Sequence, residues 1–294
     1  MVRDPCTVQP GLLSENREVH QVARTELLCG CLVADLESHI RDPTPADRHR
    51  QQGRAGRILA HRTLGTVTHT LPERPTHVLL DLDGTLTDSA PGIIASLRTA
   101  FAEAGLPVPP DPRLRRFVGP PLGLSLAGAG LTDDQAEAVV TVYRREIEVA
   151  GLHDNAVFDG IEDLLTVLRD AGTTLVVATA KPQPLARPIV AHFALEKYLT
   201  GGIEAVFGPA MEGAGQHSGK EKVVARALAA SGGDQAGARA VMVGDREHDV
   251  HAATANDIPT IGVAWGYGEP GELEEAGAAV IAASPAHLRD LLLG

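Results

Sequence analysis

Two acidic residues at the end of a short apolar run constrain this chain more than any other feature of its sequence. Residues 78–80 predict a buried strand, which stops at Asp81 and Asp83. Gly84 then permits a sharp turn, and hydroxyl side chains follow in the loop at Thr85, Thr87 and Ser89. Because open α/β sheets bind ligands at the carboxyl ends of their strands, two carboxylates placed there favour a chemical role.

The stretch DLDGTLTDS at residues 81–89 resembles the first motif of the haloacid dehalogenase-like phosphatase superfamily. An acidic strand-to-turn junction would explain this stretch taken alone, but three further motifs of the family follow in the expected order. The resemblance covers about residues 76–293. It implies an α/β fold in which a Rossmann-like parallel sheet is flanked by helices and carries an inserted all-helical cap domain.

Residues 91–154 have the pattern of helices alone. From Pro91 to Gly105, apolar side chains recur at helical spacing, and proline and glycine suit the two ends of a helix. Two further helices are expected, one at residues 111–117 and one that begins at Thr132 or Asp133 and runs to residue 149. In the family that the chain resembles, such an insert closes over the substrate as a cap.

From residue 159 onward, predicted helices and strands alternate. The strands are expected at residues 174–178, 205–207, 239–243, 260–263 and 280–281, and the helices at 161–171, 184–193, 220–230, 249–255 and 285–293. Alternation of this kind implies a parallel sheet wrapped by helices. We therefore expect an α/β core of residues 76–90 and 155–294 around a cap domain of residues 91–154.

Two further motifs supply a hydroxyl group and a cation. Thr179 ends a predicted strand and resembles the family's phosphate-binding Ser or Thr, and Ala180 and Lys181 after it are expected to bind the phosphate or substrate with it. Taken alone, Thr179 would be better explained as an ordinary strand-end threonine. Lys220, at the head of a predicted helix, resembles the lysine that pairs with both phosphate and nucleophile. A carboxylate needs such a cation to approach a phosphate dianion. The alternative is a solvated helix lysine, and Lys222 is a competitor two positions away.

The last motif places two more carboxylates after an apolar strand. Asp245 ends the strand and Asp249 lies four residues on, so a helical turn would point both the same way. Together with Asp81 they would gather several negative charges, which is unfavourable without a hard cation. Ligation by oxygen alone fits Mg²⁺.

The resemblance also implies a mechanism. Asp81 would attack phosphorus and form an aspartyl-phosphate, and Asp83 would protonate the leaving group and then activate water. Mg²⁺ would be held by Asp81, the backbone carbonyl of Asp83 and Asp245, with Asp249 supporting the ion directly or through water. Thr179 and Lys220 would hold the phosphoryl oxygens. An acid at position 83 favours a phosphatase or a phosphomutase over a dehalogenase.

Residues 115–122 look like the cap segment of phosphoglycolate phosphatase-like and 5′-nucleotidase-like members. Arg116 could then meet a substrate carboxylate and Phe117 could stack on a base, although packing between cap and core explains both residues at least as well. Two other functions stay open. One is a β-phosphoglucomutase-like phosphomutase, and the other is a catalytically silent member that binds a phosphoryl ligand or a protein partner.

Composition limits the partners that we expect. The net charge of −12 argues against a nucleic acid polymer, and no apolar run approaches the roughly 20 residues that span a bilayer. The N-terminus has no signal-peptide pattern, so we expect a cytoplasmic protein without membrane contacts. A small phosphate ester is the expected ligand, on a monomer or homodimer.

Residues 1–75 are expected to form a largely disordered N-terminal extension. Residues 41–57 mix proline, glycine and arginine as disordered segments do, whereas residues 21–40 are compatible with a helix. The extension could be a regulatory or anion-binding arm, but we favour an extension without function. All three cysteines lie within the first 31 residues, and Cys29 and Cys31 lack the second pair that a zinc site needs, so unligated thiols are expected.

Overall fold

The computed structural model describes residues 70–211 and 219–294, apart from the side chains of residues 149–153. The predictions made for the cysteines, for a helix at residues 21–40 and for disorder at residues 41–57 lie outside the described residues.

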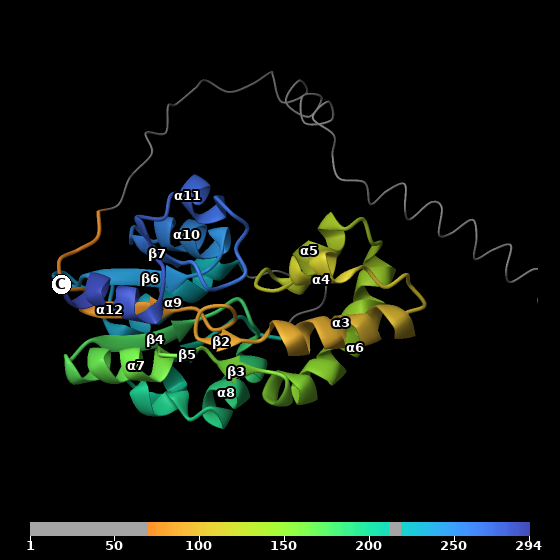
Figure 1. Cartoon of the computed structure of the whole chain (residues 1–294), viewed down its shortest axis with the longest axis horizontal. Coiled ribbons are helices and arrows are strands. Elements are labelled where there is room, and N and C mark those ends of the chain that lie inside the picture. Colours follow the sequence, from red (N-terminus) through yellow and green to blue (C-terminus); the bar gives the residue numbers. More distant parts are fainter. Residues whose placement is uncertain (1–69, 212–218) are drawn as a thin grey trace, which may run out of the picture. The chain divides into compact units, whose positions relative to one another are not determined.

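A six-stranded parallel sheet forms the centre of the described chain (Figure 1), as the sequence predicts. Its strand order is β5-β4-β1-β6-β7-β8. The strands are β1 (His77–Leu80), β4 (Thr174–Ala178), β5 (Val206–Phe207), β6 (Ala240–Gly244), β7 (Thr260–Val263) and β8 (Val280–Ala282). In β1, Leu80 is in register with Val177 of β4 and Val243 of β6, so three strands end at one edge.

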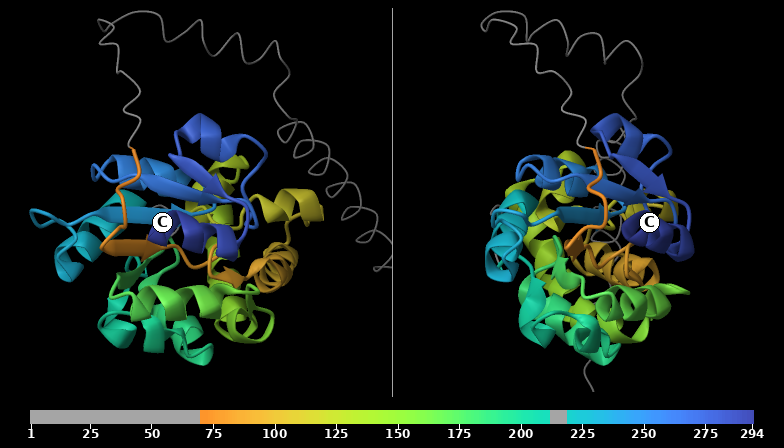
Figure 2. Two further views of the ribbon diagram at one scale, coloured as in Figure 1. Left: turned by 60° about the vertical axis from the view of Figure 1, so that its left-hand side comes forward. Right: turned by 90° about the vertical axis from the view of Figure 1, so that its left-hand side faces the viewer.

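Helices cover both faces of this sheet (Figure 2). Helices α7 (Ile161–Asp170) and α12 (Pro285–Leu293) pack together on one face, and α9 (Lys220–Ser231) and α10 (Glu247–Thr254) pack together on the other. The remaining elements are α8 (Gln183–His192), α11 (Glu272–Ala276) and the 3₁₀ helices η1 (Leu195–Tyr198) and η2 (Gly202–Ala205). Because both faces are covered, strands such as residues 78–80 are buried and apolar throughout.

A helical insert interrupts the chain after β1. It consists of α3 (Ala90–Glu103), α4 (Asp111–Arg115), α5 (Leu122–Gly128) and α6 (Asp133–His153). The short strands β2 (Thr87–Asp88) and β3 (Ala156–Val157) pair antiparallel on either side of it, which holds its two connections side by side. The insert has an apolar cluster of its own, separate from the core cluster, and Leu97, Phe101, Leu114 and Val139 are among its members.

The order of the strands decides where a ligand can bind. From β1 the chain proceeds to β4 on one side, and it later returns to β6 on the other side. Such a switch opens a crevice beyond the carboxyl ends of the central strands. The described helices include none whose length and hydropathy would suit a membrane crossing.

Candidate active site

Three buried carboxylates meet at the carboxyl edge of the sheet. Asp81 directly follows β1, Asp245 directly follows β6, and Asp249 lies in the first turn of α10. One carboxylate oxygen from each lies within 4.8 Å of the others. Asp245 and Asp249 are 0% exposed and Asp81 is 3% exposed, so this is a buried cluster with the spacing of a metal site.

Strand pairing and a helix cap place these carboxylates. The backbone N–H of Asp81 donates to the Val243 carbonyl at 2.9 Å, which continues the pairing of β1 with β6 up to the site. Helix α10 starts at residue 247 rather than at the predicted 249, and Arg246 precedes it in an extended conformation. The Asp249 side chain folds back to accept from the Arg246 N–H at 3.1 Å. A helix cap, rather than a continuous helical turn, therefore points Asp249 toward Asp245.

The turn after Asp83 leaves no room for a side chain at Gly84. Gly84 has a φ of +80°, and its N–H donates to the Thr87 carbonyl at 2.8 Å. A Cβ atom there would lie 2.2 Å from Asp245 Oδ2. The next residue, Thr85, donates from Oγ1 to Asp245 Oδ1 at 3.4 Å. The glycine thus allows the turn to close onto a carboxylate of the cluster.

Two buried lysines form ion pairs with different carboxylates of the site. Lys220 Nζ lies 2.9 Å from Asp81 Oδ1 and 2.5 Å from Asp249 Oδ1. Lys181 Nζ instead lies 2.9 Å from Asp83 Oδ2, and both of these side chains are buried. The Asp83 carboxylate is not one of the three that could share a metal ion. Lys222, the alternative to Lys220, is exposed.

Two of the carboxylates, Asp81 and Asp245, have raised pKa values and are poorly stabilised in their ionised forms. Burial raises the pKa of Asp81 to about 6 from its ordinary 3.8; Lys220 opposes the rise and Asp249 adds to it. The pKa of Asp245 is raised well above 3.8 by burial and by the charges of Asp249 and Asp81. Although burial alone would lower the pKa of Lys220, the charges of Asp249 and Asp81 outweigh it and raise that pKa. The cluster therefore favours a further positive charge.

The donor set fits a divalent metal ion. Among the described residues, four buried carboxylates and two buried lysines lie at this edge, so that in their ionised forms they leave two negative charges. All the side-chain donors of the three-carboxylate cluster are oxygen atoms, the ligands that Mg²⁺ prefers. A divalent cation bound by Asp81, Asp245 and Asp249 would neutralise these two negative charges.

The predicted phosphate-binding residues lie at the neighbouring strand end. Thr179 is buried directly after β4, and its Oγ1 accepts from the Lys181 N–H at 3.2 Å. Ala180 between them is half-buried. Thr179 and Lys181 thus meet in one loop, and the Lys181 side chain reaches the Asp83 carboxylate from there.

The two residues predicted in the insert occupy different surroundings. Phe117 is buried in the cluster of the insert, edge-on to Phe101 at 6.2 Å between ring centroids. Phe117 therefore packs within the insert itself, against another helix of the insert. Arg116 is exposed, and its Nε lies 3.6 Å from Glu269 Oε1.

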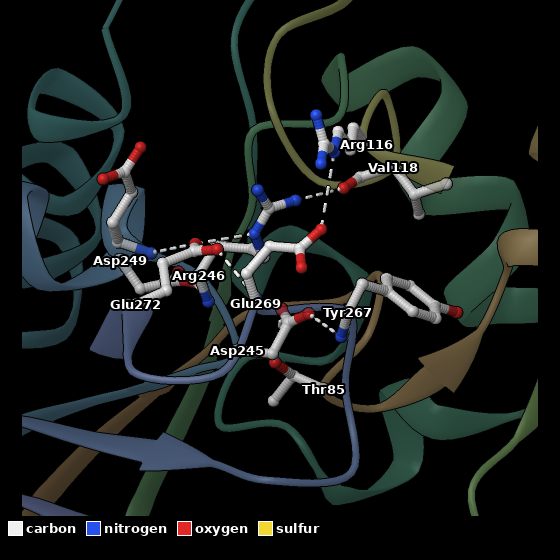
Figure 3. A network of polar contacts seen from close by, with 10 residues as sticks. Thr85, Arg116, Val118, Asp245, Arg246, Asp249, Tyr267, Glu269 and Glu272 are labelled. Atoms are coloured by element: carbon white, nitrogen blue, oxygen red, sulfur yellow. Dashed lines mark hydrogen bonds and ion pairs between the residues drawn. The ribbon is translucent and has the colours of Figure 1, made fainter. Parts of the chain in front are cut away.

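Several residues near the site were not predicted from the sequence. The Tyr267 N–H donates to Asp245 Oδ2 at 2.8 Å (Figure 3), and its hydroxyl donates to Asp88 Oδ1 at 2.8 Å. The Trp265 indole N–H donates to the Thr85 carbonyl at 3.1 Å. These contacts join residues that lie far apart in the sequence, so no local sequence pattern indicates them.

Tyr143, on helix α6 of the insert, interacts with charged groups of the site. Burial raises the pKa of the Tyr143 hydroxyl, while the charge of Lys181 lowers it and that of Asp83 raises it. The Tyr143 hydroxyl, on α6, is therefore close enough to Lys181 and Asp83 to be affected by their charges.

Comparisons with known proteins agree with the fold and with this site. A family model described as haloacid dehalogenase-like hydrolase matches residues 78–263. The chain is 41% identical over 222 residues to the tyrosine-protein kinase PtkA of Mycobacterium tuberculosis, covering 75% of this chain and 73% of that protein. It is 38% identical over 217 residues to a 5′-nucleotidase of Pseudomonas aeruginosa, covering 74% of this chain and 95% of that protein.

A solved structure is similar to this chain both in fold and in sequence. A predicted phosphatase from Clostridium acetobutylicum superposes with a TM-score of 0.68 at 38% identity, covering 76% of this chain and 99% of that one. The resemblance drawn from residues 81–89 is confirmed. Since the family model spans the sheet from β1 to β7 and the relatives align over most of the described residues, the chain belongs to the haloacid dehalogenase-like hydrolase family.

Proposed function

We propose that this chain is a Mg²⁺-dependent phosphatase that hydrolyses a small-molecule phosphate monoester through an aspartyl-phosphate on Asp81. One observation carries the proposal. The buried Asp81 carboxylate pairs with Lys220, which also contacts Asp249, and lies within metal-binding distance of two other carboxylates. Asp83, two residues on, pairs with a different lysine, Lys181. Separate lysine partners thus keep the proposed nucleophile, Asp81, apart from the proposed proton donor, Asp83, at one edge of the sheet.

The residues divide the reaction into two steps. An Asp81 oxygen attacks phosphorus, the bond to the ester oxygen breaks, and Asp83 gives its proton to that leaving oxygen. Water then attacks the acyl-phosphate phosphorus while Asp83 takes its proton, which releases phosphate and restores Asp81. Lys220 and Thr179 hold the phosphoryl oxygens during both steps.

Asp81, Asp245, Asp249 and the backbone carbonyl of Asp83 would hold Mg²⁺. When bound, the ion neutralises phosphoryl charge that the carboxylates would otherwise repel.

We infer that the insert, over about residues 91–154, acts as a cap that selects the substrate. The position of Tyr143 near Lys181 and Asp83 supports this inference. The relative named 5′-nucleotidase and the resemblance to phosphoglycolate phosphatases suggest a nucleotide or a small phosphorylated acid as substrate. Arg116 is the candidate contact for a substrate anion, with Glu269 as its present partner.

A second candidate function is phosphoryl transfer to a tyrosine. It rests on one observation, the 41% identity to a relative named tyrosine-protein kinase. The two functions share Asp81 as the group that takes the phosphoryl unit, and they differ in the acceptor, which is water in one and a phenol in the other.

Phosphate release tests the proposal. The panel holds 2-phosphoglycolate, nucleoside 5′-monophosphates, sugar phosphates and pyrophosphate, each with Mg²⁺ and with EDTA. We expect turnover of at least one ester that EDTA abolishes, and a loss of at least roughly 10²–10⁴-fold in Asp81→Asn. Asp234→Asn, at an exposed carboxylate, is the matched control.

A parallel reaction with ATP and a tyrosine peptide tests the second candidate. Phosphotyrosine without release of phosphate from any ester would contradict the phosphatase. Wild-type turnover in Asp81→Asn would contradict the choice of nucleophile.

A further inference from the structure

One arginine joins the loop of the carboxylate cluster to the insert. Arg246 lies between Asp245 and Asp249 in sequence, and its side chain is 10% exposed. Its Nη1 donates to the Val118 carbonyl at 2.6 Å (Figure 3). Val118 precedes Arg246 by 128 positions and belongs to the insert between α4 and α5. A single side chain thus spans from the β6–α10 loop to the insert.

The charge of Arg246 is already satisfied. Its Nε donates to Glu272 Oε1 at 2.8 Å, and the same carboxylate accepts from the N–H groups of Glu247 and Glu269, each at 2.9 Å. Burial would raise the pKa of Glu272, but Arg246 and these two N–H groups hold it below its ordinary value. A guanidinium neutralised in this way is poorly suited to bind a substrate phosphate, so its role must lie in the contact with the insert.

The insert is shaped to receive this side chain. Gly119 follows Val118 with a φ of +103°, and a Cβ atom there would lie 3.1 Å from Arg246 Cγ. Arg116 and Glu269 add an ion pair at 3.6 Å between the same two segments, but both side chains are exposed and such pairs contribute little. The buried Arg246 contact is therefore the stronger of the two.

The other end of Arg246 is tied to the carboxylate cluster. Its backbone N–H donates to Asp249 Oδ2 at 3.1 Å, and Asp245 is the residue before it. A displacement of Arg246 would therefore disturb the two carboxylates on either side of it.

We propose that Arg246 is a positioning residue, which holds the Val118–Gly119 turn of the insert against the β6–α10 loop. It thereby couples the position of the insert to the orientation of Asp245 and Asp249. The proposal rests on the proposed function in one respect, that these carboxylates take Mg²⁺. Coupling between two sites is reciprocal. Binding of Mg²⁺ should therefore reduce the motion of the Val118–Gly119 turn, and weakening the contact of Arg246 with this turn should lower the affinity for Mg²⁺.

The experiment measures both sides of this coupling without using activity. Isothermal titration gives the Mg²⁺ affinity, and amide hydrogen exchange over residues 116–122 reports on the turn, with and without Mg²⁺. The variants are Arg246→Gln, Arg246→Lys and, from the insert side, Gly119→Ala. The control is Arg289→Gln, which breaks an exposed ion pair with Asp290 on α12.

In the wild type and in Arg289→Gln, we expect Mg²⁺ to slow exchange in the turn. In Arg246→Gln and Gly119→Ala, this protection should disappear and Mg²⁺ should bind about tenfold more weakly. Arg246→Lys should rescue only part of the effect, because an ammonium can face Glu272 but lacks the planar fork that donates in two fixed directions.

Each contrary result has a separate meaning. Wild-type Mg²⁺ affinity in both Arg246→Gln and Gly119→Ala would overturn the coupling and leave the proposed function intact. Unchanged exchange in the turn of both variants would show that Arg246 does not hold the insert. A wild-type protein that binds no Mg²⁺ would overturn this inference together with the proposed metal site.

Discussion

At the scale of single residues, the pairing of lysines with carboxylates is the most informative feature. Asp83 Oδ2 contacts Lys181, whereas Asp83 Oδ1 is buried and has no hydrogen-bond partner among the described residues. Burial would lower the pKa of Lys181, but the charges of Asp83 and Tyr143 outweigh it and keep the lysine protonated. Lys181 thus fixes one oxygen of the acid and leaves the other for the substrate.

This arrangement predicts that Lys181→Met impairs proton transfer from Asp83 to the leaving oxygen. Alkyl phosphates, whose leaving oxygen needs a proton, should lose about 10²-fold in kcat/KM, whereas p-nitrophenyl phosphate should lose less than about threefold. Steady-state kinetics on the two esters measures the difference. Lys181→Arg keeps the cation, and Lys222→Met removes an exposed lysine as control. Equal losses on both esters would instead indicate that Lys181 binds phosphate.

The raised pKa values in the cluster predict how pH affects stabilisation by Mg²⁺. Without metal, folded Asp81 holds its proton up to about pH 6, whereas the unfolded chain releases it near 3.8. This contribution to stability is therefore present below about pH 4 and is lost as pH rises toward 6. Asp245 shifts in the same direction.

Because protons and Mg²⁺ compete for these oxygens, Mg²⁺ should raise Tm little near pH 5 and clearly more near pH 7.5. Thermal unfolding with Mg²⁺ and with EDTA at each pH measures the difference. A gain in Tm that is the same at both pH values would contradict the assignment of these carboxylates to a metal.

At the scale of elements, the turn between β1 and β2 carries the sharpest prediction. In Gly84→Ala, a positive φ costs about 1–2 kcal/mol, and the new methyl group would also displace the Asp245 carboxylate. We expect the Mg²⁺-dependent rise in Tm to disappear and turnover to fall by at least about 10²-fold. Gly105→Ala is the matched control, since Gly105 has a φ of +69° and nothing within 4 Å of its Cβ position. A comparable loss of turnover in both variants would attribute the effect to backbone strain alone.

The longer elements of the core could be predicted from the sequence because their patterns are local. The predicted strands at residues 174–178 and 260–263 and the helix at 285–293 match β4, β7 and α12 residue for residue. These segments combine continuous burial or helical spacing with clear turn residues at their ends. The acidic residues of the site follow from the same logic, since they come directly after such strands.

The missed elements depend on tertiary contacts. Strands β2 and β3 have two residues each and exist only through pairing with one another. Helix α5 lies in a glycine-rich stretch with low intrinsic helix propensity, and α11 has only five residues. The partner of Lys181 and the contacts of Arg246 were missed for the same reason, because no spacing in the sequence indicates which side chains a fold brings together.

At the scale of the whole molecule, the described residues hold every group that the proposed chemistry needs. The core and the insert have separate apolar clusters, and both lie within residues 70–294. We expect deletion of residues 1–69 to leave Tm and kcat/KM nearly unchanged. Thermal unfolding and phosphate release on the shortened and full chains test this expectation. A large fall in Tm would show that the extension stabilises the rest of the protein.

The contact made by Trp265 has a practical consequence. The chain contains a single tryptophan, and its indole N–H is bonded to the carbonyl of Thr85, one residue beyond Gly84. Indole emission shifts with the polarity and mobility of its surroundings. When only tryptophan is excited, the emission therefore comes from Trp265 and reports on its surroundings, which include this turn. The unmodified protein carries its own optical probe, with which the arrival of metal or ligand can be followed in real time.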